Sequence, residues 1–224
     1  QGISMNRRLF PWLIGLSLVF FVVAPILIVR APLEQEMGLI QKIFYFHFSA
    51  WMAMYLSICV LGISSAQFLF RRKPAADRLA VSAAEAALVF GLMGLITGPI
   101  WAVKSWGVWW NWDARTTIAL ILELILVAYL LLRSYGGPGS DRLAAGLGMF
   151  AMANLPFLYI STNIWRTIHP PTSVVPTLPV DFGIPLWWSF AGFIVLCLAL
   201  LTARVRLEEQ RATLDRLYLA LEDE

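Results

Sequence analysis

The chain has 224 residues, of which 59% are hydrophobic and only 14% are charged. Soluble domains carry about 25% charged residues, so this composition excludes an ordinary soluble domain. The net charge of +3 arises from basic residues at the ends of apolar blocks, which indicates membrane topology rather than nucleic-acid binding.

Six apolar segments reach membrane-spanning length, which is about 20 residues for a helix. They cover residues 9–29, 43–70, 79–100, 116–132, 143–160 and 185–203. Because backbone groups cannot remain unpaired in lipid, these segments predict an all-α integral membrane protein with six transmembrane helices.

Lysine and arginine residues are divided unequally between the two sides that these spans define. One side holds twelve: Arg7, Arg8, Arg71, Arg72, Lys73, Arg78, Arg133, Arg142, Arg204, Arg206, Arg211 and Arg216. The other side holds five: Arg30, Lys42, Lys104, Arg115 and Arg166. The positive-inside rule therefore predicts that both termini are cytoplasmic.

This topology predicts two long outer loops and one cytoplasmic tail. The loops are a tryptophan-rich one at 101–115 and a histidine-containing one at 161–184. The tail at 204–224 has leucines near helical spacing, and we predict a short amphipathic helix there.

The first outer loop concentrates tryptophan, since five of the ten tryptophans fall within twelve residues. They are Trp101, Trp106, Trp109, Trp110 and Trp112. An interfacial aromatic belt is the alternative interpretation, but a belt should occupy both faces of the membrane. Indoles offer flat apolar surfaces that suit a planar macrocycle, and Gly107 permits a turn or a close backbone approach.

The chain has two histidines, and both fall on the outer side. His47 lies at the start of the second span, and His169 lies in the last outer loop directly before Pro170 and Pro171. The prolines stop any helix, so we expect the His169 imidazole to be presented rather than packed. Imidazole is a common axial ligand of haem iron, and two of them would saturate the metal.

Haem also carries two propionates, for which the outer cations are candidate partners. Arg115 and Arg166 rank highest because they lie near the tryptophan segment and His169. The alternative is a solvated charge or a partner for Asp113 or Asp181.

Two acids lie within the predicted spans, where ionisable residues are candidates for function. Glu85 lies near the cytoplasmic end, where it reaches the interface or pairs with Arg78. Glu123 is the better candidate for an interior polar contact. The sequence assigns no role to either acid.

The run Trp106-Gly-Val-Trp109-Trp110-Asn-Trp112-Asp113-Ala-Arg115-x-Thr117 resembles the WGxWWxWDxRxT signature of the haem-handling (WWD-domain) proteins of cytochrome c biogenesis. Among them the chain resembles most the haem exporter protein C (CcmC) family. Tyr45-Phe-His47, Asn154-Leu155-Pro156 and Trp165-x-Thr167-Ile168-His169 resemble further motifs of that family. The likeness covers nearly the whole chain, and it implies one transmembrane haem-handling domain over residues 1–224.

The resemblance implies that His47 and His169 are the axial haem ligands and that Trp106 to Asp113 present the haem. It implies non-covalently held haem b, delivered at the periplasmic face of the bacterial inner membrane to the periplasmic haem chaperone CcmE. The implied partners are the ABC transporter subunits CcmA and CcmB and the small membrane subunit CcmD. No GxxxxGK[ST] phosphate loop occurs in the sequence, so we expect a haem-transfer subunit without its own ATPase, rather than an enzyme.

Three other functions stay open on the sequence. A subunit of the haem–cytochrome c ligation machinery would share the tryptophan signature, although such proteins usually have more spans and more histidines. A bis-histidine membrane oxidoreductase commonly holds its histidines inside the helical bundle. A structural subunit could use the tryptophan loop to dock a partner protein.

Overall fold

The structure is a computed structural model that describes residues 9–222, and six long helices form most of it. They are α1 (Leu9–Arg30), α2 (Ile43–Arg71), α3 (Pro74–Trp106), α4 (Ala114–Tyr135), α5 (Ser140–Ile164) and α6 (Val180–Glu222). Two short 3-10 helices, η1 (Leu39–Lys42) and η2 (Thr172–Thr177), lie in the connections, and no strand occurs between residues 9 and 222. All six helices are long and apolar enough to cross a membrane, which confirms the predicted fold class.

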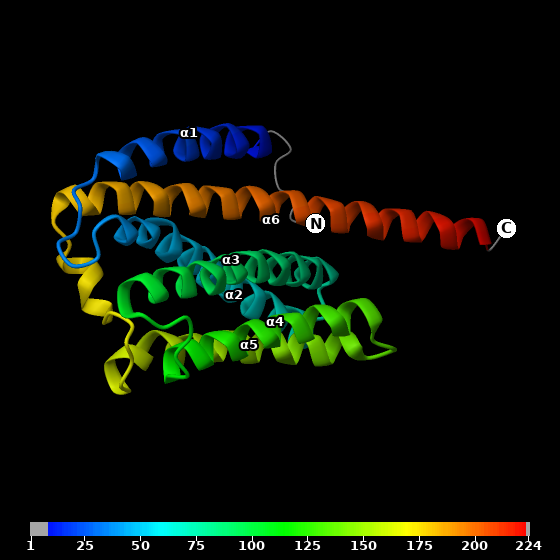
Figure 1. Cartoon of the computed structure of the whole chain (residues 1–224). Coiled ribbons are helices and arrows are strands. Elements are labelled where there is room, and N and C mark those ends of the chain that lie inside the picture. The colour runs from blue at the N-terminus through cyan, green and yellow to red at the C-terminus, as the bar shows by residue number, and fades with distance from the viewer. Residues whose placement is uncertain (1–8, 223–224) are drawn as a thin grey trace.

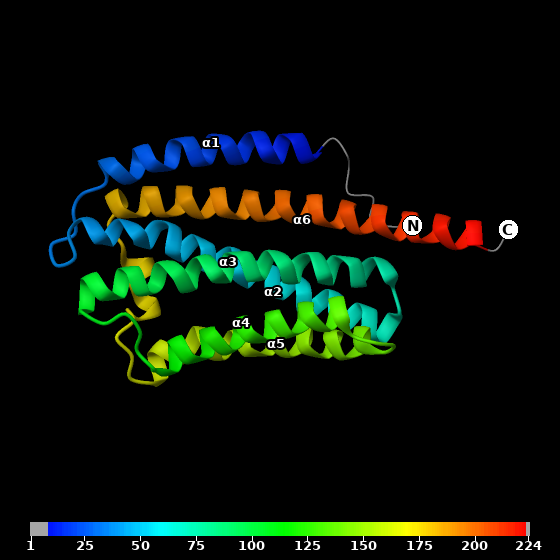
Figure 2. The same cartoon turned by 45° about the vertical axis from the view of Figure 1, so that its right-hand side comes forward.

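The helices form an antiparallel bundle in which α2 and α3 are central (Figure 1). α1 packs against α6 on one side, and α4 and α5 pack together on the other, as the turned view in Figure 2 also shows. The connections after α1, α3 and α5 therefore gather at one end of the bundle. The start of α1 and the end of α6 lie toward the opposite end.

Small residues let α2 approach α3 and α5 closely, because little side-chain volume separates the helix backbones. A Cβ added to Gly148 of α5 would lie 2.4 Å from Ser65 Oγ of α2, and one added to Gly62 would lie 2.5 Å from Met152 Cβ of α5. Ala53 and Ala87 are completely buried between α2 and α3 and their neighbours. Close packing thus fixes α2 against both α3 and α5.

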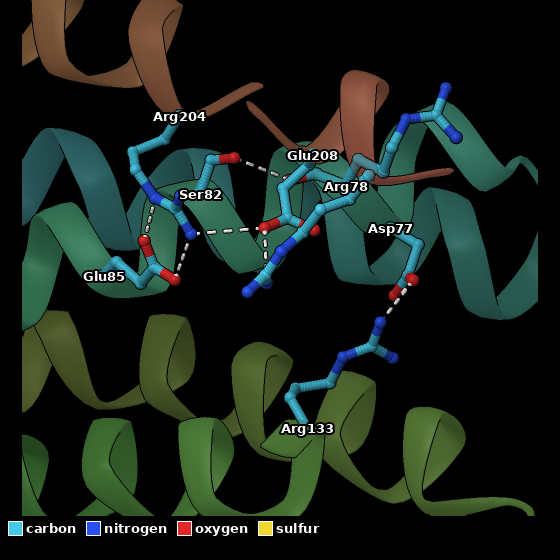
Figure 3. Close-up of polar contacts among 8 residues, drawn as sticks. Asp77, Arg78, Ser82, Glu85, Arg133, Arg204 and Glu208 are labelled. Carbon is cyan, nitrogen blue, oxygen red and sulfur yellow. Dashed lines mark hydrogen bonds and ion pairs between the residues drawn. The ribbon is translucent and has the colours of Figure 1, made fainter. Parts of the chain in front are cut away.

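Ion pairs join the helices toward the end from which α6 projects (Figure 3). Arg133 of α4 contacts Asp77 of α3 at 2.6 Å, and Arg204 of α6 pairs with Glu85 of α3. The sequence left two possibilities for Glu85, reaching the interface or pairing with Arg78, and in the structure its partner is Arg204 rather than Arg78. Residues that are 119 positions apart in sequence meet here because α3 and α6 lie side by side.

Several helices run beyond the segments that hydropathy predicts. α3 continues to Trp106, so the first part of the expected 101–115 loop is helical, and the connection itself spans residues 107–113. α3 ends there because Gly107 adopts a left-handed conformation with φ of 75°.

α6 begins at Val180, inside the expected 161–184 loop, and continues without a break to Glu222. The expected tail helix is therefore part of α6, because no glycine or proline interrupts residues 203–222. Arg7 and Arg8, used in the charge count, and the last two residues of the tail lie outside the described residues.

Candidate functional site: a histidine pair between two cavities

The two histidines meet at the end of the bundle where the connections after α1, α3 and α5 gather. His47 lies in the second turn of α2 and is buried, with 6% of its surface exposed. His169 lies in the 165–179 connection, and its ring centroid is 6.5 Å from that of His47, with an angle of 37° between the planes. Metal–imidazole nitrogen bonds are about 2 Å long, so two imidazoles on opposite sides of one metal have centroids roughly 6 Å apart. The centroid distance of the pair is therefore close to that of two imidazoles that share one metal ion.

Hydrogen bonds define which nitrogen of His47 carries the proton. The Thr97 hydroxyl donates to the carbonyl of Met93 at 2.7 Å, so its oxygen is left to accept from His47 Nδ1 at 2.9 Å. His47 Nε2 then carries the lone pair and accepts the indole N–H of Trp51 at 3.2 Å. Thr97 thus selects the tautomer whose Nε2 can bind a metal.

His169 has the same tautomer for a different reason. Its Nδ1 lies 2.9 Å from the carbonyl of Pro170, which can only accept, so Nδ1 carries the proton and Nε2 is free to ligate. Burial, followed by the nearby charge of Arg115, lowers the pKa of His169 from 6.5 to about 4. The imidazole is therefore neutral at physiological pH, as a metal ligand must be.

Asp113 joins the loop before α4 to the connection that carries His169. It is the N-cap of α4 and accepts the backbone N–H of Thr116 at 3.0 Å. Its Oδ2 accepts from the Asn111 side chain at 3.2 Å and from the Thr167 hydroxyl, and Thr167 in turn accepts the His169 backbone N–H at 3.1 Å. Partial burial alone raises the pKa of Asp113, but these hydrogen bonds outweigh it and hold the pKa below its usual value. Asp113 and Asn111 thus position the histidine loop.

Two cavities flank the histidine pair, and both histidines line both of them. The larger cavity, of about 530 Å³, lies between α2 and the 165–179 connection, and most of its lining is apolar, including Phe44, Phe48 and Pro170. The smaller, of about 80 Å³, lies between α3, α4 and the 107–113 connection. Small-molecule sites are typically about 300–1,000 Å³ and mainly apolar, and the larger cavity fits that description.

The predicted haem-presenting segment divides between the cavity wall and the surface. Trp106, Trp109, Trp110 and Asp113 line the smaller cavity. Trp112 lines neither cavity and is 73% exposed. Gly107 also lines neither cavity, and the structure uses it for the turn that ends α3.

Arg115 and Arg166, the candidate partners of the haem propionates, occupy different positions in the structure. Arg115 lines both cavities, and its Nη1 donates to the carbonyl of Leu158 at 3.0 Å. Arg166 is exposed on the surface and lines neither cavity. The structure therefore brings only Arg115 to the histidine pair.

Glu123 lies deeper in the bundle, where it packs against Gly91 of α3. It is buried, and neither carboxyl oxygen has a hydrogen-bond partner among the described residues. Glu123 thus lies in the interior of the bundle, as expected, but no described residue makes the expected polar contact with its carboxyl group.

Comparison with known proteins adds an independent observation. Residues 2–218 match the family described as "Heme exporter protein C". The chain belongs to the haem exporter protein C family.

Several relatives named for haem export or cytochrome c biosynthesis align over most of this member of the haem exporter protein C family. A "Heme exporter protein C" of Bradyrhizobium diazoefficiens is 32% identical, over 97% of this chain and 85% of the relative. One of Escherichia coli K12 is 32% identical, over 93% of this chain and 89% of the relative. A "Putative cytochrome c biosynthesis ccmC-like mitochondrial protein" of Marchantia polymorpha is 32% identical, over 74% of this chain and 72% of the relative.

Four residues of the site in this haem exporter protein C family member were not predicted as site residues, although the sequence had drawn attention to Trp101 and Thr167 within its motifs. Trp51 and Trp101 line both cavities, and Thr97 sets the tautomer of His47. Thr167 links the two loops. Trp51 stands one helical turn after His47 in the sequence, and this spacing, which places both on one helix face, could have pointed to it.

Proposed function

We propose that this chain binds haem between His47 and His169 and passes it to a periplasmic haem chaperone, CcmE, during cytochrome c maturation. The observation that carries the proposal is the histidine pair, with centroids 6.5 Å apart between two cavities. Membership of the haem exporter protein C family supports haem handling as the general role.

Two histidines alone are too few ligands for a free metal ion, so the pair favours a metal that is already coordinated by another group. Protein sites for free transition metals use three or four side chains, whereas a porphyrin supplies four nitrogens and leaves two axial positions. The Nε2 atoms of His47 and His169 carry the lone pairs that would occupy those two positions, and the His47 lone pair would do so in place of its hydrogen bond from Trp51. The site suits haem b held without covalent attachment, since the sequence has no CxxCH motif.

The cavity walls match the two kinds of surface on a haem. The larger cavity offers apolar side chains to the macrocycle, and indoles of Trp106, Trp109 and Trp110 line the smaller one. Arg115 lines both cavities and supplies a cation for a propionate. Two imidazoles on the iron would saturate it, which would favour holding and transfer over oxygen chemistry.

The unequal distribution of lysine and arginine between the two ends of the bundle supports a periplasmic position for the site and cytoplasmic termini. Of the lysines and arginines between residues 9 and 222, ten belong to the side where α6 ends and five to the side of the histidines. By the positive-inside rule, the histidine end faces away from the cytoplasm of a bacterial inner membrane. CcmA, CcmB and CcmD are the partners that we propose, because the sequence has no GxxxxGK[ST] motif for using ATP itself.

The experiment that tests this function measures haem loading and transfer in one preparation. Purified protein in lipid nanodiscs is loaded with haemin and mixed with purified apo-CcmE, and absorption spectra follow both proteins. We expect a low-spin six-coordinate spectrum that His47→Ala and His169→Ala each alter, and transfer to CcmE that Trp110→Ala slows. Unchanged spectra in both histidine variants would contradict the site, and rapid reduction of the bound haem by quinol would instead favour an oxidoreductase.

A further inference from the structure

Trp51 makes a contact that the proposed haem ligation does not use. Its indole Nε1–H donates to His47 Nε2 at 3.2 Å, and this is the nitrogen left free for a metal by the bond between Nδ1 and Thr97. One lone pair cannot bind iron and accept this hydrogen bond together. The indole and the metal are therefore alternative partners of the same atom.

The position of Trp51 is built into the packing of α2 against α3. A Cβ added to Gly94 of α3 would lie 2.4 Å from Trp51 Cε2 and 2.6 Å from its Nε1. The missing side chain at Gly94 thus lets the indole lie directly against the α3 backbone. The indole also lines both cavities, so it stands where a ligand of His47 would enter.

We propose that Trp51 competes with haem iron for His47 Nε2 and thereby speeds haem release. This inference rests on the proposed function, because it requires His47 to be a haem ligand. On release the iron–Nε2 bond breaks, and the same lone pair accepts the indole N–H. No proton or electron is transferred, and the imidazole keeps its tautomer because Thr97 still accepts from Nδ1.

A protein that passes haem on must also release it, and the hydrogen bond from Trp51 would favour release. Any interaction that is present only without the ligand stabilises the ligand-free state and weakens binding. It also satisfies a buried polar nitrogen that would otherwise stay unpaired after haem leaves. Because the indole N–H takes up the lone pair as the iron bond breaks, its hydrogen bond would also stabilise the transition state of release. One neutral hydrogen bond corresponds to a change of roughly three- to tenfold, which we expect in the release rate.

The test measures the rate at which full-length, haem-loaded protein in nanodiscs loses haem to excess apomyoglobin. Trp51→Phe removes the indole N–H, and we expect release to slow by roughly three- to tenfold. Benzothienylalanine at position 51 replaces only the N–H by sulfur, and it should slow release to a similar extent. Trp188→Phe is the matched control, because its indole donates to Phe20 O at 3.0 Å outside both cavities, and its rate should equal that of the parent.

A second readout does not depend on rates. Ultraviolet resonance Raman difference spectra between parent and Trp51→Phe should show a hydrogen-bonded indole N–H in haem-free protein and its loss after loading. Parent-like or faster release in the benzothienylalanine protein would overturn the role of Trp51. A His47→Ala protein that releases haem at the parent rate would instead overturn the ligand assignment on which the proposed function depends.

Discussion

The Thr167 hydroxyl donates a hydrogen bond to Asp113 Oδ2 and so joins two connections that lie 54 residues apart in sequence. The same hydroxyl oxygen accepts the backbone N–H of His169 at 3.1 Å. The aspartate of the tryptophan segment therefore acts on the histidine through one threonine.

Thr167→Val should loosen His169 without removing it. The variant loses both hydrogen bonds while keeping a similar shape, so we expect several-fold weaker haem retention and a spectrum with more five-coordinate haem. Global stability should fall by about 2 kcal/mol, because two hydrogen bonds are lost and each usually contributes about 1 kcal/mol. Thr177→Val is the control, because its hydroxyl donates within η2 to Ser173 O and lines neither cavity. Equal haem retention in the two variants would contradict the link.

Arg115 should recognise a propionate, and esterified haem tests this directly. We expect haem dimethyl ester to bind the parent more weakly than haem, by roughly tenfold, because a charge-assisted pair is lost. In Arg115→Gln the two ligands should bind with similar affinity. Arg166→Gln should keep the preference of the parent, since Arg166 is exposed and lines neither cavity. A preference that survives in Arg115→Gln would show that another group binds the propionate.

His169 should remain neutral well below pH 6.5 in the haem-free protein. Burial and Arg115 lower its pKa to about 4, whereas the pKa in the unfolded chain is about 6.5. As pH falls from about 6.5 to 4, the unfolded chain takes up a proton at this residue and the folded protein does not, so the free energy of unfolding falls. Nitrogen-15 NMR of labelled histidine should show a neutral His169 ring at pH 5, with His169→Gln used to assign the signal. A protonated ring at pH 6 would contradict this environment.

The Arg204–Glu85 pair should stabilise the bundle without affecting the site. Its side chains are 28% and 32% exposed, so we expect Arg204→Ala to lower stability by about 1 kcal/mol and the midpoint of thermal unfolding by a few degrees. The haem spectrum should not change. Arg211→Ala is the control, because Arg211 is 74% exposed and contacts Glu208 at 3.5 Å. Equal unfolding midpoints for the two variants would contradict a structural role for the pair.

The sequence was sufficient to predict the spans and the common end of the two histidines. Apolar blocks determine where helices cross a membrane, and an even number of crossings returns the chain to the same side. His47 precedes the body of the second span and His169 precedes the sixth, so their meeting at one end followed from topology.

The side-chain partners could not be predicted, because they depend on how each helix is rotated about its axis. Glu85 faces Arg204 rather than Arg78 for this reason, and Thr97 reaches His47 only because α2 and α3 pack closely. Hydropathy likewise underestimated the length of α6, because it does not detect the charged part of this helix.

The central claim is that one iron atom binds both His47 and His169. Electron–nuclear double resonance of ferric haem, in protein containing nitrogen-15 histidine, measures this directly. The account predicts strong couplings to two histidine nitrogens in the parent and to one in either His47→Ala or His169→Ala. Fewer than two couplings in the parent, or two couplings that persist in either variant, would contradict it.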